Sequence, residues 1–259
     1  MTRIIAVANQ KGGVGKTTTS VNLAASLSLS GSRVLLVDLD PQGNATMGCG
    51  VEKNTVTRSV YDWLVKGASL ADVVQPCPTG FEIVPSNIDL TAAEVELLQA
   101  DQRELRLKRA LAEAQGRYHY VIIDCPPSLN MLTLNALVAS DSVLIPMQCE
   151  YYALEGLTAL LDTIEGVRRR ANPRLRMEGI LRTMYDPRSS LTRDVSRQLL
   201  KFFGEKVFRT VIPRNVRLAE APSHGLPVIL YDRQSRGAVA YMALAGELKR
   251  HSVSGEGDA

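Results

Sequence analysis

The chain has 259 residues, of which 45% are hydrophobic, 22% charged and 5% aromatic, and its net charge is +3. This length and composition support a large buried core, which excludes a disordered or fibrous protein, and the few aromatic residues argue against a broad stacking surface for single-stranded nucleic acid. Because no apolar run is long enough for a membrane span or a signal-peptide core, we expect a cytoplasmic protein that does not act at a membrane.

Short apolar runs alternate with longer helical patterns along the chain. The runs that predict strands are 3–8, 33–38, 81–85, 120–124, 142–147, 178–183 and 207–212. The patterns that predict helices are 16–30, 91–115, 153–170, 195–203 and 235–250. This alternation predicts an α/β fold with a doubly wound, mostly parallel sheet and helices on both faces. We find no repeat and no linker, so we expect one domain over residues 1–251 and a flexible tail over 252–259.

The most informative segment is a glycine-rich loop, residues 11–18, between the first predicted strand and the first predicted helix. Glycines let backbone N–H groups approach an anion, and the helix that follows directs its positive end to the same place. In such a loop Lys16 reaches the β- and γ-phosphates of a nucleotide and the Thr17 hydroxyl can ligate Mg²⁺. The general phosphate-loop pattern requires glycine at position 10, where this chain has Gln10. The residues expected to bind ATP are Lys11, Gly12, Gly13, Val14, Gly15, Lys16, Thr17 and Thr18.

Three carboxylates follow predicted strands. Asp38 and Asp40 come at the end of the second strand, and Asp124 ends the strand at 120–124. Ligands of open parallel sheets bind at the carboxyl ends of the strands, so these acids would lie beside the nucleotide. Mg²⁺, a cation with oxygen ligands, resolves the repulsion between them and the phosphates. For Asp38 two interpretations stay open: it supports the metal shell, or its carboxylate accepts hydrogen bonds from nearby backbone N–H groups.

The loop KGGVGKTT, with an extra lysine at its start, is a deviant Walker A motif. Together with the segments DLDPQGN at 38–44, DCPP at 124–127, QCEYYALEG at 148–156 and VIPRNVRLAEAP at 211–222, it resembles the ParA/Soj partitioning ATPases of the MinD/ParA superfamily, and the Soj-like chromosomal branch in particular. The resemblance extends over about residues 2–250. It implies a P-loop ATPase, weak alone and stimulated by DNA and a ParB/Spo0J-type centromere-binding protein, that acts in chromosome or plasmid segregation and associates with the nucleoid.

The resemblance also implies residue roles. Lys16 and Asp40 would be catalytic, with Asp40 orienting or activating the attacking water, and Lys11 would reach the partner's nucleotide across an ATP-dependent sandwich homodimer. Asp124 occupies the Walker B position and would hold Mg²⁺ through water, so the metal residues are Thr17, Asp40 and Asp124. Pro213 and Asn215 match a loop that packs on the adenine base.

Residues 166–217 contain 14 Lys and Arg against 4 Asp and Glu, a net charge of +10 in a nearly neutral chain. Such a local excess attracts polyanions. Relatives bind double-stranded DNA without sequence preference through arginines in this region, and the matching residues are Arg188, Arg214 and Arg217.

Two other functions of the same superfamily were weighed. A MinD-like membrane-cycling protein would end in a basic amphipathic helix, whereas the segment 240–250 has two basic residues and an acidic tail follows it. An ATP-dependent ligase of cobyrinate or dethiobiotin synthesis would need a second substrate pocket, for which no motif is visible. The four cysteines, Cys49, Cys77, Cys125 and Cys149, lack metal-site spacing and are expected to be free thiols.

Overall fold

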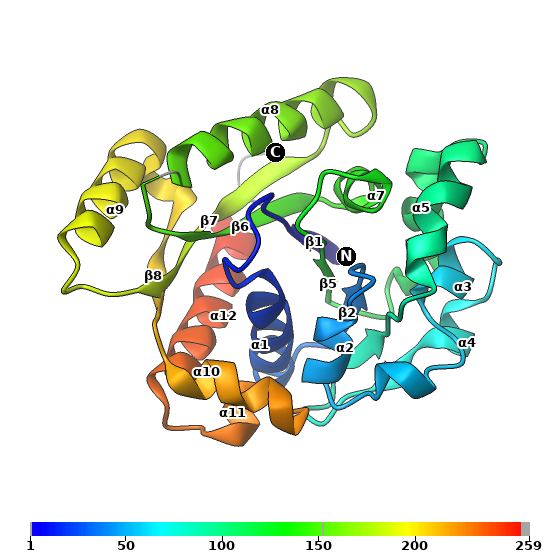
Figure 1. The fold of residues 1–259 in the computed structure, drawn as a ribbon, viewed down its shortest axis with the longest axis horizontal. Helices are drawn as coiled ribbons and strands as arrows, with labels where there is room; N and C mark the ends of the chain where they lie inside the picture. The colour runs from blue at the N-terminus through cyan, green and yellow to red at the C-terminus, as the bar shows by residue number, and fades with distance from the viewer. Residues whose placement is uncertain (1, 152, 255–259) are drawn as a thin grey trace.

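The computed structural model describes residues 2–151 and 153–254, and Figure 1 shows their arrangement. Their centre is an eight-stranded sheet in the order β3-β4-β2-β5-β1-β6-β7-β8. Neighbouring strands are parallel except the short edge pair β3–β4. The strands are β1 (Arg3–Val7), β2 (Val34–Asp38), β3 (Gln75–Pro76), β4 (Glu82–Val84), β5 (Tyr120–Asp124), β6 (Ser142–Gln148), β7 (Arg176–Tyr185) and β8 (Val207–Pro213).

Helices cover both faces of this sheet, which confirms the predicted doubly wound α/β fold (Figure 1). Those on one face are α1 (Lys16–Leu29), α2 (Asn44–Gly48), α10 (Val216–Glu220), α11 (Val228–Tyr231) and α12 (Arg236–Ser254). Those on the other are α3 (Val60–Leu64), α4 (Leu70–Val73), α5 (Leu90–Gln99), α6 (Arg106–Ala110), α7 (Met131–Ala139), α8 (Ala153–Arg170) and α9 (Ser190–Phe203). Short 3-10 turns are η1 (Lys53–Thr55), η2 (Arg103–Leu105), η3 (Leu111–Ala114), η4 (Gly204–Lys206) and η5 (Ala221–His224).

The central strands are apolar on both sides because each side supplies one of two cores. In β1, Ile4 and Ala6 join the core under α3 to α9, whereas Ile5 and Val7 join the core under α1 and α12. This follows from the alternation of side chains along a strand. No helix in the described part of the chain is long and apolar enough to cross a membrane.

Several predicted helix bounds were wrong. The pattern at 91–115 is broken after α5, where Gln102 takes a positive φ of 49° and the chain continues as η2, α6 and η3. The cause is tertiary, because the buried Asn135 of α7 accepts from the Leu107 backbone N–H (3.1 Å) and donates to the Arg103 carbonyl (2.9 Å). Helix α7 itself was not predicted.

The two C-terminal helix predictions also differ from the structure. Helix α9 begins at residue 190 rather than 195, since the Ser189 hydroxyl caps it by accepting from the Thr192 N–H (3.2 Å). Helix α12 continues through Ser254, three residues into the segment expected to be a flexible tail, and residues 255–259 lie outside the described part.

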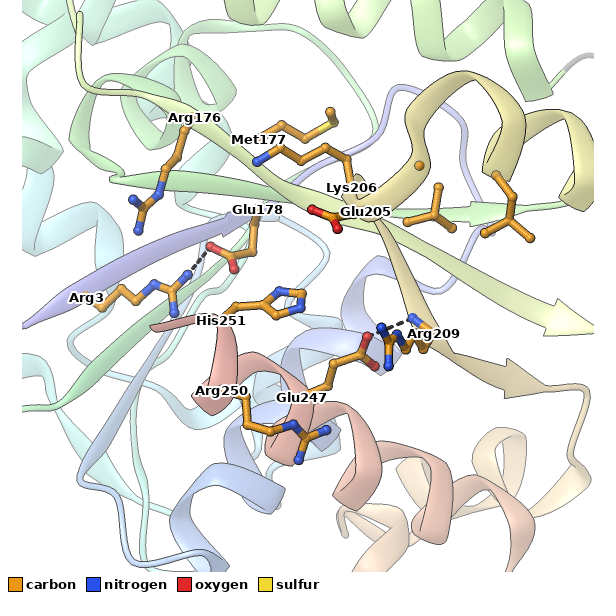
Figure 2. A pocket seen from close by; sticks show the side chains of 13 residues that line it. Arg3, Arg176, Met177, Glu178, Glu205, Lys206, Arg209, Glu247, Arg250 and His251 are labelled. Atoms are coloured by element: carbon orange, nitrogen blue, oxygen red, sulfur yellow. Dashed lines mark hydrogen bonds and ion pairs between the residues drawn. The ribbon is translucent and has the colours of Figure 1, made fainter. Parts of the chain in front are cut away.

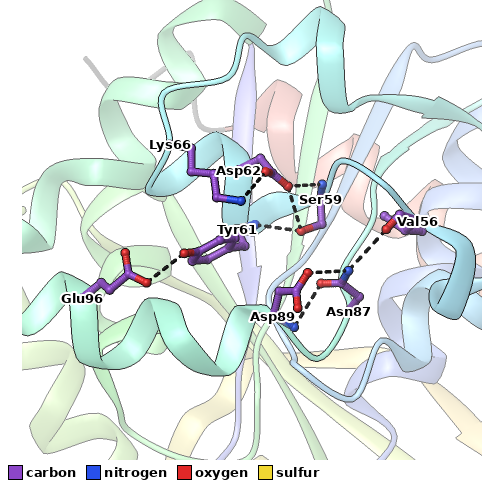
Figure 3. A network of polar contacts seen from close by, with 8 residues as sticks. All are labelled: Val56, Ser59, Tyr61, Asp62, Lys66, Asn87, Asp89 and Glu96. Carbon is purple, nitrogen blue, oxygen red and sulfur yellow. Dashed lines mark hydrogen bonds and ion pairs between the residues drawn. The ribbon is translucent and has the colours of Figure 1, made fainter.

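A polar network holds α3 against α5 (Figure 3). Ser59 and Asp62 form a capping box at the start of α3, and the Tyr61 hydroxyl donates to Glu96 of α5 at 2.8 Å. The Asn87 side-chain amide donates hydrogen bonds to the Val56 carbonyl and to the Asp89 carboxylate. Helix α5 is thereby fixed at the edge of the sheet where the site lies.

Candidate functional site

The phosphate loop (residues 11–18) joins β1 to α1 at the carboxyl edge of the sheet. Gly13 and Gly15 have φ values of 72° and 85°, a left-handed backbone that favours glycine, and Gly15 forms the N-cap of α1. A buried hydroxyl on β7 anchors the loop, because Thr183 Oγ1 donates to the Val14 carbonyl at 2.8 Å. The loop is therefore held open beside the positive end of α1.

Lys16 is poised at the centre of this loop. It is 7% exposed, and its Nζ donates to the Lys11 carbonyl at 3.0 Å. Burial lowers its pKa, while the charges of Asp124 and Asp40 act in the opposite direction. The Lys16 ammonium donates to one neutral carbonyl in a partly desolvated site. A phosphate oxygen in place of that carbonyl would form a stronger hydrogen bond, because the acceptor would then be charged.

Asp38 and Asp124 end neighbouring strands and lie opposite each other in the β2–β5 register. Both carboxylates are fully buried. Burial raises the pKa of Asp38 to about 6, and burial together with the charge of Asp38 raises that of Asp124 to about 8.

The two carboxylates nevertheless have different surroundings. Asp38 Oδ1 accepts from the Asp40 N–H (3.1 Å), and Oδ2 accepts from the N–H and hydroxyl of Thr46 (2.8 and 2.7 Å). Of the two interpretations left open for Asp38, the structure supports the one in which it orders the backbone. It holds the turn that carries Asp40, which is 9% exposed and faces the cavity described next.

The loop and the carboxyl edge enclose a cavity of about 610 Å³. It brings together most of the predicted nucleotide residues, namely Gly12, Gly13, Gly15, Lys16, Thr17, Thr18 and Asp40. Five of its other walls, Pro41, Gln42, Asn44, Pro126 and Pro127, belong to motif segments that the sequence singled out without assigning them a role. Sequence reasoning missed the remaining walls, which are Thr91, Glu94, Ser128, Asn130 and Met184. A helix-start signal was available for Asn130, whose side chain caps α7 by accepting from the Thr133 N–H at 3.0 Å.

One buried oxygen at the base of this site suits a cation. Asp124 Oδ1 accepts from the Ser20 hydroxyl at 2.8 Å, whereas Oδ2 has no hydrogen-bond partner among the described residues. The described residues contain no cluster of three His, Cys, Asp or Glu that could hold a metal alone. A Mg²⁺ ion with phosphate oxygens and waters among its ligands fits this arrangement, because Mg²⁺ in nucleotide sites is bound in that way.

Lys11 lies outside the residues that line the cavity. Its ammonium forms an ion pair with Glu150, beyond the end of β6, at 2.5 Å, and both side chains are 43% exposed. Lys16 therefore lines the cavity, whereas the neighbouring loop residue Lys11 does not.

The predicted base-contact residues also lie outside the cavity lining. Asn215 caps α10, with its Oδ1 accepting from the Arg217 N–H at 3.0 Å, and Pro213 ends β8. Their contact with adenine stays a prediction. All four cysteines are buried free thiols, as expected.

The three predicted DNA-binding arginines gather at the carboxyl ends of β7 and β8. Tyr185 pairs with Pro213 in the strand register, and the Arg214 N–H bonds the Tyr185 carbonyl at 3.3 Å. Arg188 and Arg217 are ion-paired, Arg188 with Asp186 (2.9 Å), and Arg217 with Glu220 (2.8 Å) and Asp232 (3.4 Å). The arginines are exposed, so these pairs are exchangeable for phosphates.

Comparisons with known proteins agree with this geometry. Residues 2–177 match a protein family described as an AAA domain. The sporulation initiation inhibitor protein Soj of Bacillus subtilis is 57% identical over 249 residues, covering 96% of this chain and 98% of the relative. The chromosome partitioning protein ParA of Myxococcus xanthus is 52% identical over 97% of this chain and 89% of that protein. Among solved structures, cobyrinic acid a,c-diamide synthase from Mycobacterium smegmatis with bound ADP and magnesium has a TM-score of 0.87 and 42% identity, covering 98% of this chain and 97% of that one.

Proposed function

Because this chain belongs to the ParA/Soj family of chromosome-partitioning ATPases, we propose that it is an ATP-driven dimerisation switch for DNA segregation. Mg·ATP binding forms a sandwich homodimer that holds double-stranded DNA without sequence preference. Hydrolysis, stimulated by DNA and a ParB/Spo0J-type centromere-binding protein, releases it. The observation that carries the proposal is that Lys16 and Asp40 line one cavity, while Lys11 of the same loop lies outside the lining in an exposed ion pair.

Within one subunit, the chain's residues divide the work of phosphoryl transfer, which needs positioning and charge neutralisation. Lys16 exchanges the Lys11 carbonyl for phosphate oxygens. Asp40, held by Asp38 through the backbone, orients the attacking water. Thr17 and Asp124, with Asp40 beside them, would hold Mg²⁺, which neutralises phosphate charge when bound.

Dimerisation rests on Lys11 and Gly12. The Lys11 side chain does not line its own cavity and is restrained only by an exposed ion pair, so it can exchange Glu150 for the partner's nucleotide at little cost. Gly12 is exposed, and a Cβ built on it would meet no atom within 4 Å. The space beside Gly12 is therefore open in one subunit and would be filled by the second.

Gly12→Val tests this arrangement. The variant should fold and bind Mg·ATP like the wild type, because the added methyl groups enter open space, but light scattering with ATP should show a monomer. ATPase rates measured with DNA, with the centromere-binding protein, with both and with neither should be highest with both in the wild type and unstimulated in the variant. A stable ATP dimer of Gly12→Val would refute the sandwich.

A second candidate function comes from the solved structure named cobyrinic acid a,c-diamide synthase, which is 42% identical to this chain. The Soj and ParA relatives are more similar, at 57% and 52% identity, and therefore favour partitioning. The two functions differ in what accelerates ATP turnover. Acceleration by cobyrinic acid with glutamine, and none by DNA with the centromere-binding protein, would reverse the assignment.

A further inference from the structure

A second and larger cavity lies at the opposite edge of the sheet from the phosphate loop. It measures about 850 Å³ and is formed where β7 and β8 begin and where α12 approaches its end (Figure 2). The strands are parallel, so their starts share this edge while the nucleotide cavity takes the carboxyl edge. Nothing in the partitioning mechanism above uses this cavity.

Two buried carboxylates form the floor of this cavity. Glu178, 7% exposed, accepts from the Arg3 guanidinium and from the Ser142 hydroxyl at 2.6 Å. Glu247, 6% exposed, accepts from the backbone N–H groups of Arg209 (2.7 Å) and Thr210 (3.0 Å). These bonds join β1, β6, β7, β8 and α12 into a fixed surface, and they engage both carboxylates with partners inside the protein.

The rim, in contrast, carries cations without counter-ions. Arg176, Lys206 and Arg209 are exposed and surround the cavity from β7, η4 and β8, and their side chains form no ion pair within residues 2–151 and 153–254 (Figure 2). The exposed carboxylate among the lining residues is Glu205. Elsewhere in the basic segment, Arg168, Arg188, Arg197 and Arg217 are each paired with a nearby acid. Three cations of the segment that have no ion pair among the described residues therefore line one cavity.

We propose that this cavity is a second phosphate-binding site of the protein, independent of the phosphate loop. Guanidinium groups offer paired donors that match phosphate oxygens, and an ammonium adds a compact charge beside them. A ligand with several negative charges would replace the missing counter-ions, whereas the charged walls disfavour an apolar ligand.

Phosphate groups can reach the site from two sources. One is a free polyphosphate ligand, which would give the protein a second small-molecule site. The other is the backbone of DNA, and this case rests on the proposed function. β7 has 10 residues and spans about 30 Å, and β8 beside it is the edge strand of the sheet, so a duplex held at Arg188 that passed outside β8 toward Arg176 would cover about nine base pairs.

The test compares two double variants with the same chemistry and the same change of charge. Arg176→Gln/Lys206→Gln removes two rim cations, and Arg117→Gln/Lys66→Gln removes two exposed cations that are paired with Glu82 and Asp62 away from the cavity. Tripolyphosphate is titrated calorimetrically into full-length protein carrying Lys16→Ala, which disables the phosphate loop. The rim variant should lose about tenfold or more in affinity, because charge-assisted hydrogen bonds disappear, while the control stays within about twofold.

The two sources are separated by binding of a random-sequence duplex, which is measured by fluorescence anisotropy with ATP in proteins that keep Lys16. A loss of DNA affinity in the rim variant identifies the DNA backbone, and a loss confined to tripolyphosphate identifies a free ligand. If neither affinity falls below that of the control variant, the proposed site is refuted. ATP-dependent dimerisation of the same proteins reports on the proposed function separately, and the rim changes should leave it unchanged.

Discussion

The phosphate loop and the carboxyl ends of β7 and β8 both carry cations that we propose bind phosphate groups, yet the protein holds these cations differently. Lys16 is 7% exposed, bonded to its own loop and surrounded by fully or nearly buried carboxylates. The side chain of Arg188 is 88% exposed and is held by one neighbouring aspartate. In the proposed function, the first arrangement fixes a charge beside the phosphate that is transferred, and the second lets long side chains adjust to a DNA backbone of any sequence.

This difference predicts how each region responds to change. A buried charge in a fixed site interacts strongly and cannot be replaced by its neighbours, whereas exposed pairs contribute little each and are screened by salt. Substitutions in the loop should therefore abolish a function, and substitutions at the β7–β8 end should reduce one gradually.

The largest expected effect comes from Lys16→Ala. The variant should lose at least about a hundredfold in affinity for Mg·ATP, because roughly two charge-assisted hydrogen bonds in a partly dry site are removed. Calorimetric titration measures this directly. Equal affinity in variant and wild type would show that the loop does not use Lys16, and the comparison between the regions would fail.

Asp40→Ala should have a more selective effect. Hydrolysis should fall by about 10²–10⁴-fold, since the group that orients the water is lost, while Mg·ATP binding and dimerisation persist. Single-turnover phosphate release and light scattering with ATP measure the two properties. Asp38→Asn is a useful second variant, because it perturbs the turn that carries Asp40 while the Asp40 carboxylate itself is kept. A monomeric Asp40→Ala with ATP would contradict the assigned role.

Arg188→Ala and Arg217→Ala should each weaken DNA binding moderately and by the same factor on unrelated duplexes. The slope of log affinity against log salt should flatten by about 0.9 for each lost phosphate contact. Salt titrations with ATP and with ADP measure this, and Arg117→Ala, an ion-paired arginine beside Glu82, serves as the control. Loss on one duplex alone would mean base readout instead.

The smallest effect concerns pH and the protein without nucleotide or metal. The raised pKa of Asp124 means that the folded state binds a proton more tightly than the unfolded chain. Its contribution to the free energy of unfolding is complete below the unfolded value of 3.8 and is lost as pH rises to about 8. Urea denaturation across this range should show that the free energy of unfolding falls more steeply with pH in the wild type than in Asp124→Asn. Parallel pH dependences of the two proteins would contradict a raised pKa of Asp124.

Much of this protein could be predicted because its information is local. Glycine spacing around Lys16, the apolar runs of the central strands and the acids at their ends are properties of a few neighbouring residues. Backbone geometry converts them directly into a strand, a turn and a helix start. The fold class and the residues that line the phosphate end of the nucleotide cavity follow from that alone.

Tertiary packing decided what depends on residues far apart in the chain. Thr183 anchors the loop from 169 positions away, and Asn135 breaks a helical pattern by bonding a backbone that its own segment does not contain. Net charge in sequence located the basic segment, but the position of each carboxylate in space determined which arginines are paired and which surround the far cavity. Local sequence thus determines which groups are available, and long-range packing determines their partners, because burial and hydrogen bonding are set by neighbours in space.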